Sequence, residues 1–254
     1  MESFTSYFEG RNANVSFDAL KNFNALSSGV QKHLQRVYIT LTAAVLVAAV
    51  GVYAHTLLNL GGTLTHLGFI GLTIWLTMTP ATPAQEGKRM SLLMGAAFLQ
   101  GCSLGTLVQV ILAIDPSIVL MAFLGTTAVF ACFSGAALLA QRRSYLYLGG
   151  VLSSAVSVMM MLHLGSWLFG RSAAMFQLEL YAGLLVFCAY VIYDTQVIVE
   201  RAVRGEKDHI KHALDLFVDF VAIFVRLMVI LAQNEQKKER REREKRNKSN
   251  TVRR

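Results

Sequence analysis

Apolar residues are grouped along this chain in long runs that are separated by short polar connections. Seven such runs can be delimited, at residues 37–59, 64–79, 90–112, 118–140, 145–168, 176–199 and 213–232. A helix needs roughly 17–25 mostly apolar residues to cross a bilayer, and connections this short force neighbouring helices to pack antiparallel. The pattern predicts an all-α polytopic membrane protein that folds as one seven-helix transmembrane bundle.

Polar segments flank the predicted bundle of residues 37–232. Residues 1–36 are polar and mixed in charge, and they lack the basic region and short apolar stretch of a cleavable signal peptide. Residues 233–254, here called the basic tail, hold ten Lys or Arg and four acids, and so carry most of the formal net charge of +8. We expect a disordered, cytoplasmic tail. The whole chain is only 16% charged, against about 25% in soluble domains, and we expect no nucleic-acid partner.

The distribution of Lys and Arg predicts the orientation of the bundle. Basic residues lie in the N-terminal segment and near residues 88–89, 142–143 and 201–211, which are alternate connections. By the positive-inside rule these connections and the N-terminus are cytoplasmic. Seven full crossings would put the basic tail on the far side, whereas a tail this basic is expected in the cytoplasm. Two alternatives therefore stay open for residues 213–232: the run spans the membrane, or it re-enters.

The last apolar run contains three charged residues on one face. At 100° per residue of an α-helix, Asp215, Asp219 and Arg226 fall at about 0°, 40° and 20°. An ionised Asp or Arg near the bilayer centre costs on the order of 2.5–3.5 kcal/mol on insertion scales. We therefore expect this stripe to face the interior of the bundle or water. Arg226 would act there as a counter-ion or snorkel to the interface, and Asp215 either belongs to a site or is solvated.

Another acid lies in the preceding run. Asp194 comes about six residues before the end of its run, and Asp219 about six residues after the start of the next one. In an antiparallel pair of helices the two carboxyl groups would lie at one depth and share one proton. We interpret them as a pH-dependent gate whose deprotonated oxygens could bind Ca²⁺. The alternative is structural, with Asp194 capping a helix or pairing with Arg226 or Arg89.

Other residues carry weaker signals. His209 and His212 flank the last run and could sense pH, although histidines in loops are often only solvated. The basic tail could bind anionic lipid or calmodulin, or be a solvated segment that fixes topology. We expect no enzymatic activity: an intramembrane aspartyl protease is disfavoured because Asp219 follows Leu-Phe-Val rather than Gly-x-Gly. The tail residues in question are Lys237, Lys238, Arg240, Arg241, Arg243, Lys245 and Arg246.

Several motifs, taken in order, resemble the Bax inhibitor-1 family (transmembrane Bax inhibitor motif-containing proteins), and most of all its plant members. The resemblance covers nearly the whole chain, and the combination of motifs is specific although each alone is weak. The motifs are Val30–Tyr38, Lys88-Arg-Met-Ser-Leu-Leu93, Asp115-Pro-Ser-Ile118, Arg142–Gly150, Tyr193-Asp-Thr-Gln196 and Asp215-Leu-Phe-Val-Asp-Phe220.

The resemblance implies a function that the residues alone do not give. It implies a seven-helix bundle with the last helix in the centre, an endoplasmic reticulum membrane address, a cytoplasmic tail and suppression of programmed cell death. It also implies a pH-sensitive Ca²⁺ leak channel or Ca²⁺/H⁺ exchanger, gated by Asp194 and Asp219 with Arg89 as a partner. Ca²⁺ would be the transported ion, with no cofactor. The competing hypothesis is a non-transporting scaffold that binds other membrane proteins of the endoplasmic reticulum through the basic tail.

Overall fold

All regular structure in the described part of the chain is helical. The computed structural model describes residues 27–139, 147–170 and 172–252, so that most of the predicted N-terminal segment and the basic residues 142–143 lie outside the described residues. The fold class predicted from the apolar runs is confirmed. In chain order the elements are α2 (Ser28–Leu58), α3 (Thr63–Met78), the short 3₁₀ helix η1 (Pro83–Gln85), α4 (Glu86–Leu112), α5 (Ser117–Leu139), α6 (Leu148–Phe169), α7 (Ala173–Val203) and α8 (His209–Val252).

Five stretches are long and apolar enough to cross a membrane. They are Ser28–Leu58, Pro83–Leu112, Ser117–Leu139, Leu148–Ser166 and Ala173–Val203, whereas α3 is a shorter apolar helix. Large apolar side chains point outward from these helices: Met160 and Met161 of α6 are both 74% exposed. Such surfaces would drive aggregation in water but are the expected lipid-facing surface of a bundle. The chain is therefore a multi-pass membrane protein.

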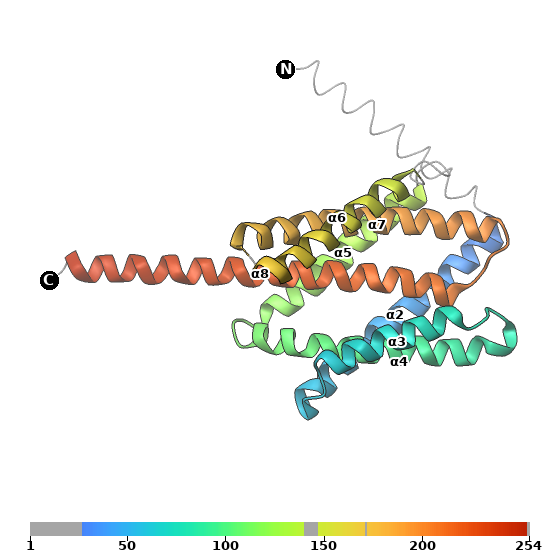
Figure 1. Cartoon of the computed structure of the whole chain (residues 1–254), viewed down its shortest axis with the longest axis horizontal. Coiled ribbons are helices and arrows are strands. Elements are labelled where there is room, and N and C mark those ends of the chain that lie inside the picture. Colours follow the sequence, from blue (N-terminus) through green and yellow to red (C-terminus); the bar gives the residue numbers. More distant parts are fainter. Residues whose placement is uncertain (1–26, 140–146, 171, 253–254) are drawn as a thin grey trace, which may run out of the picture.

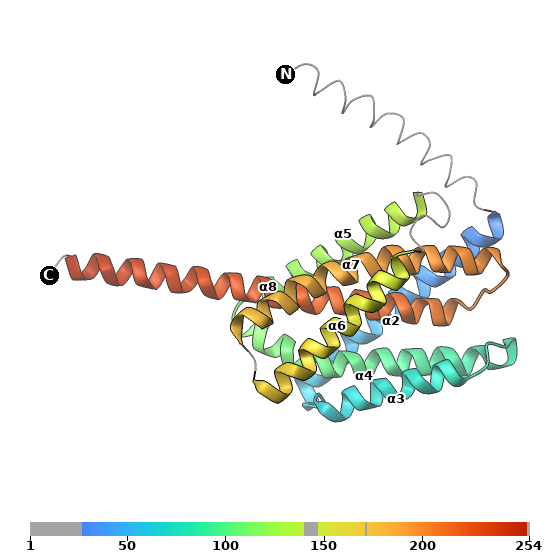
Figure 2. The ribbon, with the colours of Figure 1, turned by 45° about the horizontal axis from the view of Figure 1, so that its top comes forward.

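The last helix lies in the centre of the bundle, as predicted. Figures 1 and 2 show α3 and α4 on one side of α8 and α7 on the other, and α8 packs against α2, α4, α5 and α7. Its side chains Phe217, Ile223 and Met228 are at most 1% exposed. A helix surrounded by other helices can carry charged residues without exposing them to lipid, and this position accounts for the acids of α8.

Small residues bring α2 and α4 close together. A Cβ atom added at Gly101 of α4 would collide with the backbone of Ala48, and one added at Gly51 of α2 would collide with the backbone of Phe98. Helices in lipid gain little from the hydrophobic effect and depend on close van der Waals packing. These two glycines therefore fix the distance between α2 and α4.

The basic tail is helical, whereas we expected it to be disordered. α8 is one unbroken helix through Val252, and residues 209–252 contain neither Gly nor Pro. The basic tail is thus a helical extension rather than a disordered segment, stabilised by the ion pairs Lys238–Glu235 (3.1 Å) and Arg243–Glu239 (3.7 Å).

The unbroken α8 also decides where the basic tail leaves the bundle. The tail projects from the end opposite to the start of α2 (Figure 1), and the charge of Lys238 interacts with Asp115 in the α4–α5 connection. α8 therefore does not turn back between His209 and Val252. The side of the membrane that the tail faces and the cytoplasmic position of the α2 start stay predictions from the Lys and Arg pattern.

Candidate functional site

Two carboxyl groups meet between the last two helices. The side chains of Asp194 on α7 and Asp219 on α8 form a hydrogen bond to each other. These two residues are here called the acid pair. Asp219 is only 3% exposed, and its Oδ2 atom has no hydrogen-bond partner among the described residues. Two carboxyl groups can bond in this way only when one of them is protonated and donates. The contact therefore requires one proton held between α7 and α8.

The short connection between α7 and α8 produces this meeting. α7 ends at Val203 and α8 begins at His209, so the two helices run antiparallel from one turn. Gly205 in that turn has φ +94°, a left-handed conformation that glycine adopts without strain. Equal distances along the helices from this turn place the two acids at one depth.

The polar residues next to Asp194 point to another helix. Thr195 Oγ1 lies 3.4 Å from Ser134 Oγ of α5, and Gln196 Nε2 donates to the Ala137 carbonyl oxygen at 3.3 Å. Because successive residues of a helix differ by 100° in direction, these two side chains tie α7 to α5, whereas Asp194 faces α8.

Asp215 is a third acid near the acid pair. It lies one turn before Asp219 on α8, is half-buried, and interacts electrostatically with both Asp194 and Asp219. The cations that act on it are Lys211 and Arg201. The structure therefore gathers all three acids that the sequence singled out, but hydrogen bonding joins only Asp194 and Asp219.

The predicted counter-ion Arg89 pairs with a different acid. Its Nη1 and Nη2 atoms donate to Oδ1 and Oδ2 of Asp208 at 2.7 and 2.6 Å, and Arg89 is 4% exposed. Asp208 also accepts the backbone N–H of Lys211 at 3.1 Å, as an N-cap residue does. Burial disfavours the ionised carboxylate, but these hydrogen bonds outweigh it and hold the pKa of Asp208 below its ordinary value.

Sequence reasoning missed Asp208, although an Asp shortly before an apolar helical run is a recognisable signal for the start of a helix. The Arg89–Asp208 pair joins the start of α4 to the start of α8. Its role is thus to fix the end of the central helix, and Arg89 is not a counter-ion of the acid pair in this structure.

Arg226 does not pair with the aspartates of its own helix. Its Nη1 donates to the Ala222 carbonyl oxygen at 2.9 Å, and its guanidinium lies 4.5 Å from the centre of the Phe187 ring. Glu179 of α7 is the acid whose charge acts on it. Arg226 therefore lies on the same face of α8 as Asp219, but it interacts with Phe187 and Glu179 of α7 rather than with Asp194.

The two predicted pH sensors are packed rather than solvated. His212 is 2% exposed, and its Nδ1 lies 3.0 Å from Nε2 of His33 on α2. His209 Nε2 lies 3.7 Å from Glu86 Oε1, with 14% of its side chain exposed. The apolar pattern did not indicate His33, because this residue lies in the polar segment of residues 1–36, before the first apolar run. A role of these histidines in pH sensing stays a prediction.

The acid pair has too few ligands for a resident metal ion. Within the described ranges no three His, Cys, Asp or Glu side chains gather closely enough to hold one. Ca²⁺ takes six to eight oxygen ligands, and Asp194 with Asp219 supplies at most four.

The seven basic residues of the tail named above are all exposed on the extension of α8.

Comparison with known proteins identifies the family. A family described as "Inhibitor of apoptosis-promoting Bax1" matches residues 30–236. Proteins named Bax inhibitor 1 are similar over most of their length: that of Arabidopsis thaliana is 49% identical over 94% of this chain and 96% of its own.

The similarity extends beyond plants. Bax inhibitor 1 of Oryza sativa subsp. japonica is 46% identical over 94% of this chain and 96% of its own, and that of Homo sapiens is 45% identical over 88% and 95%. The matches cover nearly the whole length of all three relatives. The chain therefore belongs to the Bax inhibitor-1 family of membrane proteins that suppress cell death.

Proposed function

We propose that this protein suppresses programmed cell death from the endoplasmic reticulum membrane by letting Ca²⁺ leave the store, as a leak channel or a Ca²⁺/H⁺ exchanger gated by the acid pair. The names of the relatives support the suppression of cell death, and the endoplasmic reticulum address is part of the proposal. The observation that carries the second part is the buried hydrogen bond between Asp194 and Asp219 on adjacent helices. The proposal assigns transport and regulation to the protein, and no catalytic step.

The chemistry of the acid pair supports a gate. With one proton between them, the two carboxyl groups hold α7 and α8 together through a hydrogen bond worth about 1 kcal/mol net. When that proton leaves, two like charges 4 Å apart repel by about 4 kcal/mol at an effective dielectric of 20. Since repulsion exceeds the lost attraction, deprotonation favours separation of the helices.

Ca²⁺ is the ion that this arrangement suits best. Deprotonated carboxylates are the hard oxygen ligands that Ca²⁺ prefers, and a pair supplies charge without enclosing the ion. Asp215 lies one turn away and would extend the acidic surface toward the α7–α8 turn. A passing ion needs binding that is favourable but weak, which an incomplete site provides.

The test is Ca²⁺ flux from proteoliposomes loaded with a Ca²⁺-sensitive dye, measured from about pH 5 to pH 8. Wild type should show a flux that rises as pH rises, whereas Asp219→Asn, which keeps the shape and loses the charge, should show a flux that hardly depends on pH. Asp115→Asn is the matched control, because Asp115 lies in the exposed α4–α5 connection. An Asp219→Asn protein with wild-type flux at every pH would refute the gate.

A scaffold is the second candidate function, and the exposed basic helix favours it. The tail projects from the bundle as a continuous helix (Figure 1), a form that anionic lipid, calmodulin or another membrane protein could bind. On this hypothesis the acids serve folding only. Deleting residues 233–254 would then abolish protection of cells while flux through the reconstituted bundle persists. The gate hypothesis expects the opposite dependence, on Asp219.

A further inference from the structure

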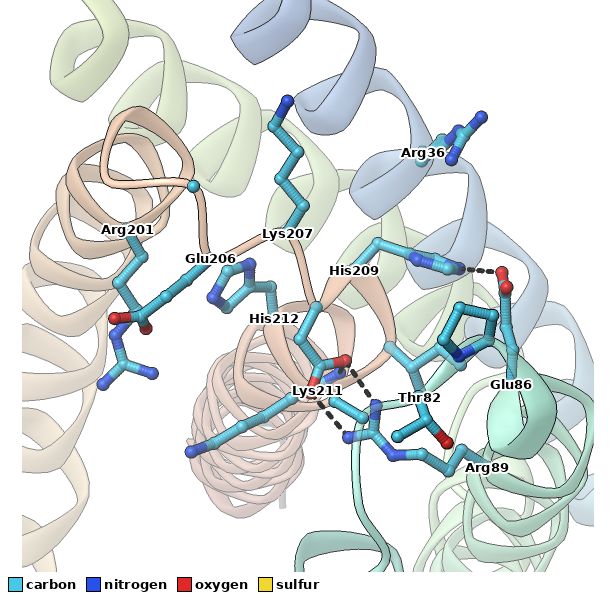
Figure 3. A pocket seen from close by; sticks show the side chains of 15 residues that line it. Arg36, Thr82, Glu86, Arg89, Arg201, Glu206, Lys207, His209, Lys211 and His212 are labelled. Carbon is cyan, nitrogen blue, oxygen red and sulfur yellow. Dashed lines mark hydrogen bonds and ion pairs between the residues drawn. The ribbon is translucent and has the colours of Figure 1, made fainter.

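A polar cavity of about 560 Å³ opens at the end of the bundle where α8 begins. Its walls come from α2, η1, the start of α4, the end of α7 and the connection to α8 (Figure 3). Small-molecule sites typically measure about 300–1,000 Å³, so the cavity has the size of a ligand site. It is here called the turn cavity, and it is separate from the acid pair, neither of whose residues lines it.

The lining of the turn cavity is rich in cations. Five Lys or Arg side chains and three carboxylates line it. One cation is neutralised, because both Nη atoms of Arg89 are paired with Asp208. None of the other four forms an ion pair within 4 Å with a residue that the structure describes, although the charges of Arg201 and Lys211 also act on Asp215. These four are Arg36, Arg201, Lys207 and Lys211.

The remaining acids do not cancel this charge. Glu86 lies 3.7 Å from His209, and Glu206 is an exposed residue of the turn. In Figure 3 these four cationic side chains come from α2, the end of α7, the α7–α8 connection and the start of α8. Lys and Arg side chains outnumber carboxylates around the cavity, and a cleft whose lining has a positive potential attracts anions.

The helix that begins at the turn cavity contributes side chains to its lining. α8 runs for 44 residues from His209, and His209, Ile210, Lys211 and His212 of its first turn all line the cavity. The carboxylate of Asp208 caps this helix by accepting the backbone N–H of Lys211 at 3.1 Å, and it offsets the positive end of the helix dipole. The positive charge of the cavity therefore comes from side chains.

We propose that the turn cavity binds a phosphate-bearing anion. Lys supplies a compact charge with three donors and Arg a planar fork of donors, and both are the common partners of phosphate oxygens. The phosphate could belong to a soluble molecule or to the headgroup of a lipid at the membrane surface. The site binds the group by charge and hydrogen bonds, and no covalent step is involved.

The test uses the full chain in phosphatidylcholine nanodiscs with two probes. Inorganic pyrophosphate, titrated by calorimetry, tests a soluble ligand, and native mass spectrometry of protein purified with phosphatidic acid tests a lipid ligand. The variant Lys207→Gln/Lys211→Gln removes two cavity cations and should weaken binding about tenfold or more. Lys32→Gln/Lys88→Gln is the matched control, since it removes two exposed lysines from the same end that do not line the cavity.

Each outcome decides the proposal. Binding of either probe that falls in the cavity variant and not in the control supports it, and the probe that binds tells a soluble from a lipid source. The proposal is overturned if neither probe binds wild type, or if the two variants weaken binding equally. The substituted side chains are exposed or half-buried, and both variants should elute from a sizing column as wild type does.

Discussion

Replacing Asp208 by Ala should destabilise the bundle by about 3–5 kcal/mol, the range found when one partner of a buried ion pair is removed. The side chains of Arg89 and Asp208 are 5% and 20% exposed, so this pair is closer to a buried pair than to a surface pair, which contributes about 0–1 kcal/mol. The Arg89 Nε atom already has no hydrogen-bond partner within the described chain. Without Asp208 the whole guanidinium would stay buried and charged, and α8 would lose its N-cap, worth about 1 kcal/mol.

The free energy of unfolding can be measured in mixed micelles by titration with SDS, followed by tryptophan fluorescence. Lys238→Ala is the control, because it breaks the exposed pair with Glu235 and should cost less than about 1 kcal/mol. The double variant Arg89→Met/Asp208→Leu should be less destabilised than Asp208→Ala, since no unpaired charge remains. If Asp208→Ala costs no more than Lys238→Ala, the reasoning is wrong.

The same pair predicts a pH dependence. The folded-state pKa of Asp208 is lowered, so its contribution is complete above the ordinary Asp pKa of about 4 and is lost as pH falls through the lower folded value. Wild type should lose this part of its stability in that acidic range, whereas Asp208→Ala lacks it at all pH values. Equal acid sensitivity of the two proteins would contradict the assignment.

Three further predictions use the same preparations. Gly101→Ala should cost about 1–3 kcal/mol by forcing α2 and α4 apart, whereas Gly135→Ala, which meets nothing within 4 Å, should be neutral or slightly stabilising in the SDS titration. Deleting residues 233–254 should leave the Ca²⁺ flux of proteoliposomes unchanged if the acid pair is the gate, and a lost flux would place part of the gate in the tail. Asp194→Asn/Asp219→Asn should show the same flux as Asp219→Asn alone, because residues that act as a unit are not additive, and a further change in flux would argue against a shared proton.

Local pattern was sufficient for the elements and for part of the site. Each apolar run became a helix because the length and composition of a run are local properties, and these properties decide whether a segment can cross a bilayer. Depth along a helix is local too, so counting residues from the α7–α8 turn predicted that Asp194 and Asp219 lie opposite each other. The central position of α8 followed from the family resemblance, and the acids that lipid would reject were consistent with it.

Partners between helices were decided only by the tertiary structure. Sequence reasoning assigned Arg89 to Asp194, and only the packing of α4 against the start of α8 shows that its partner is Asp208. His33 and His212 are 179 residues apart and meet for the same reason. The rotation of each helix about its axis depends on the summed packing of all its neighbours, so a pattern along one helix predicts which residues face inward but not which residues they meet.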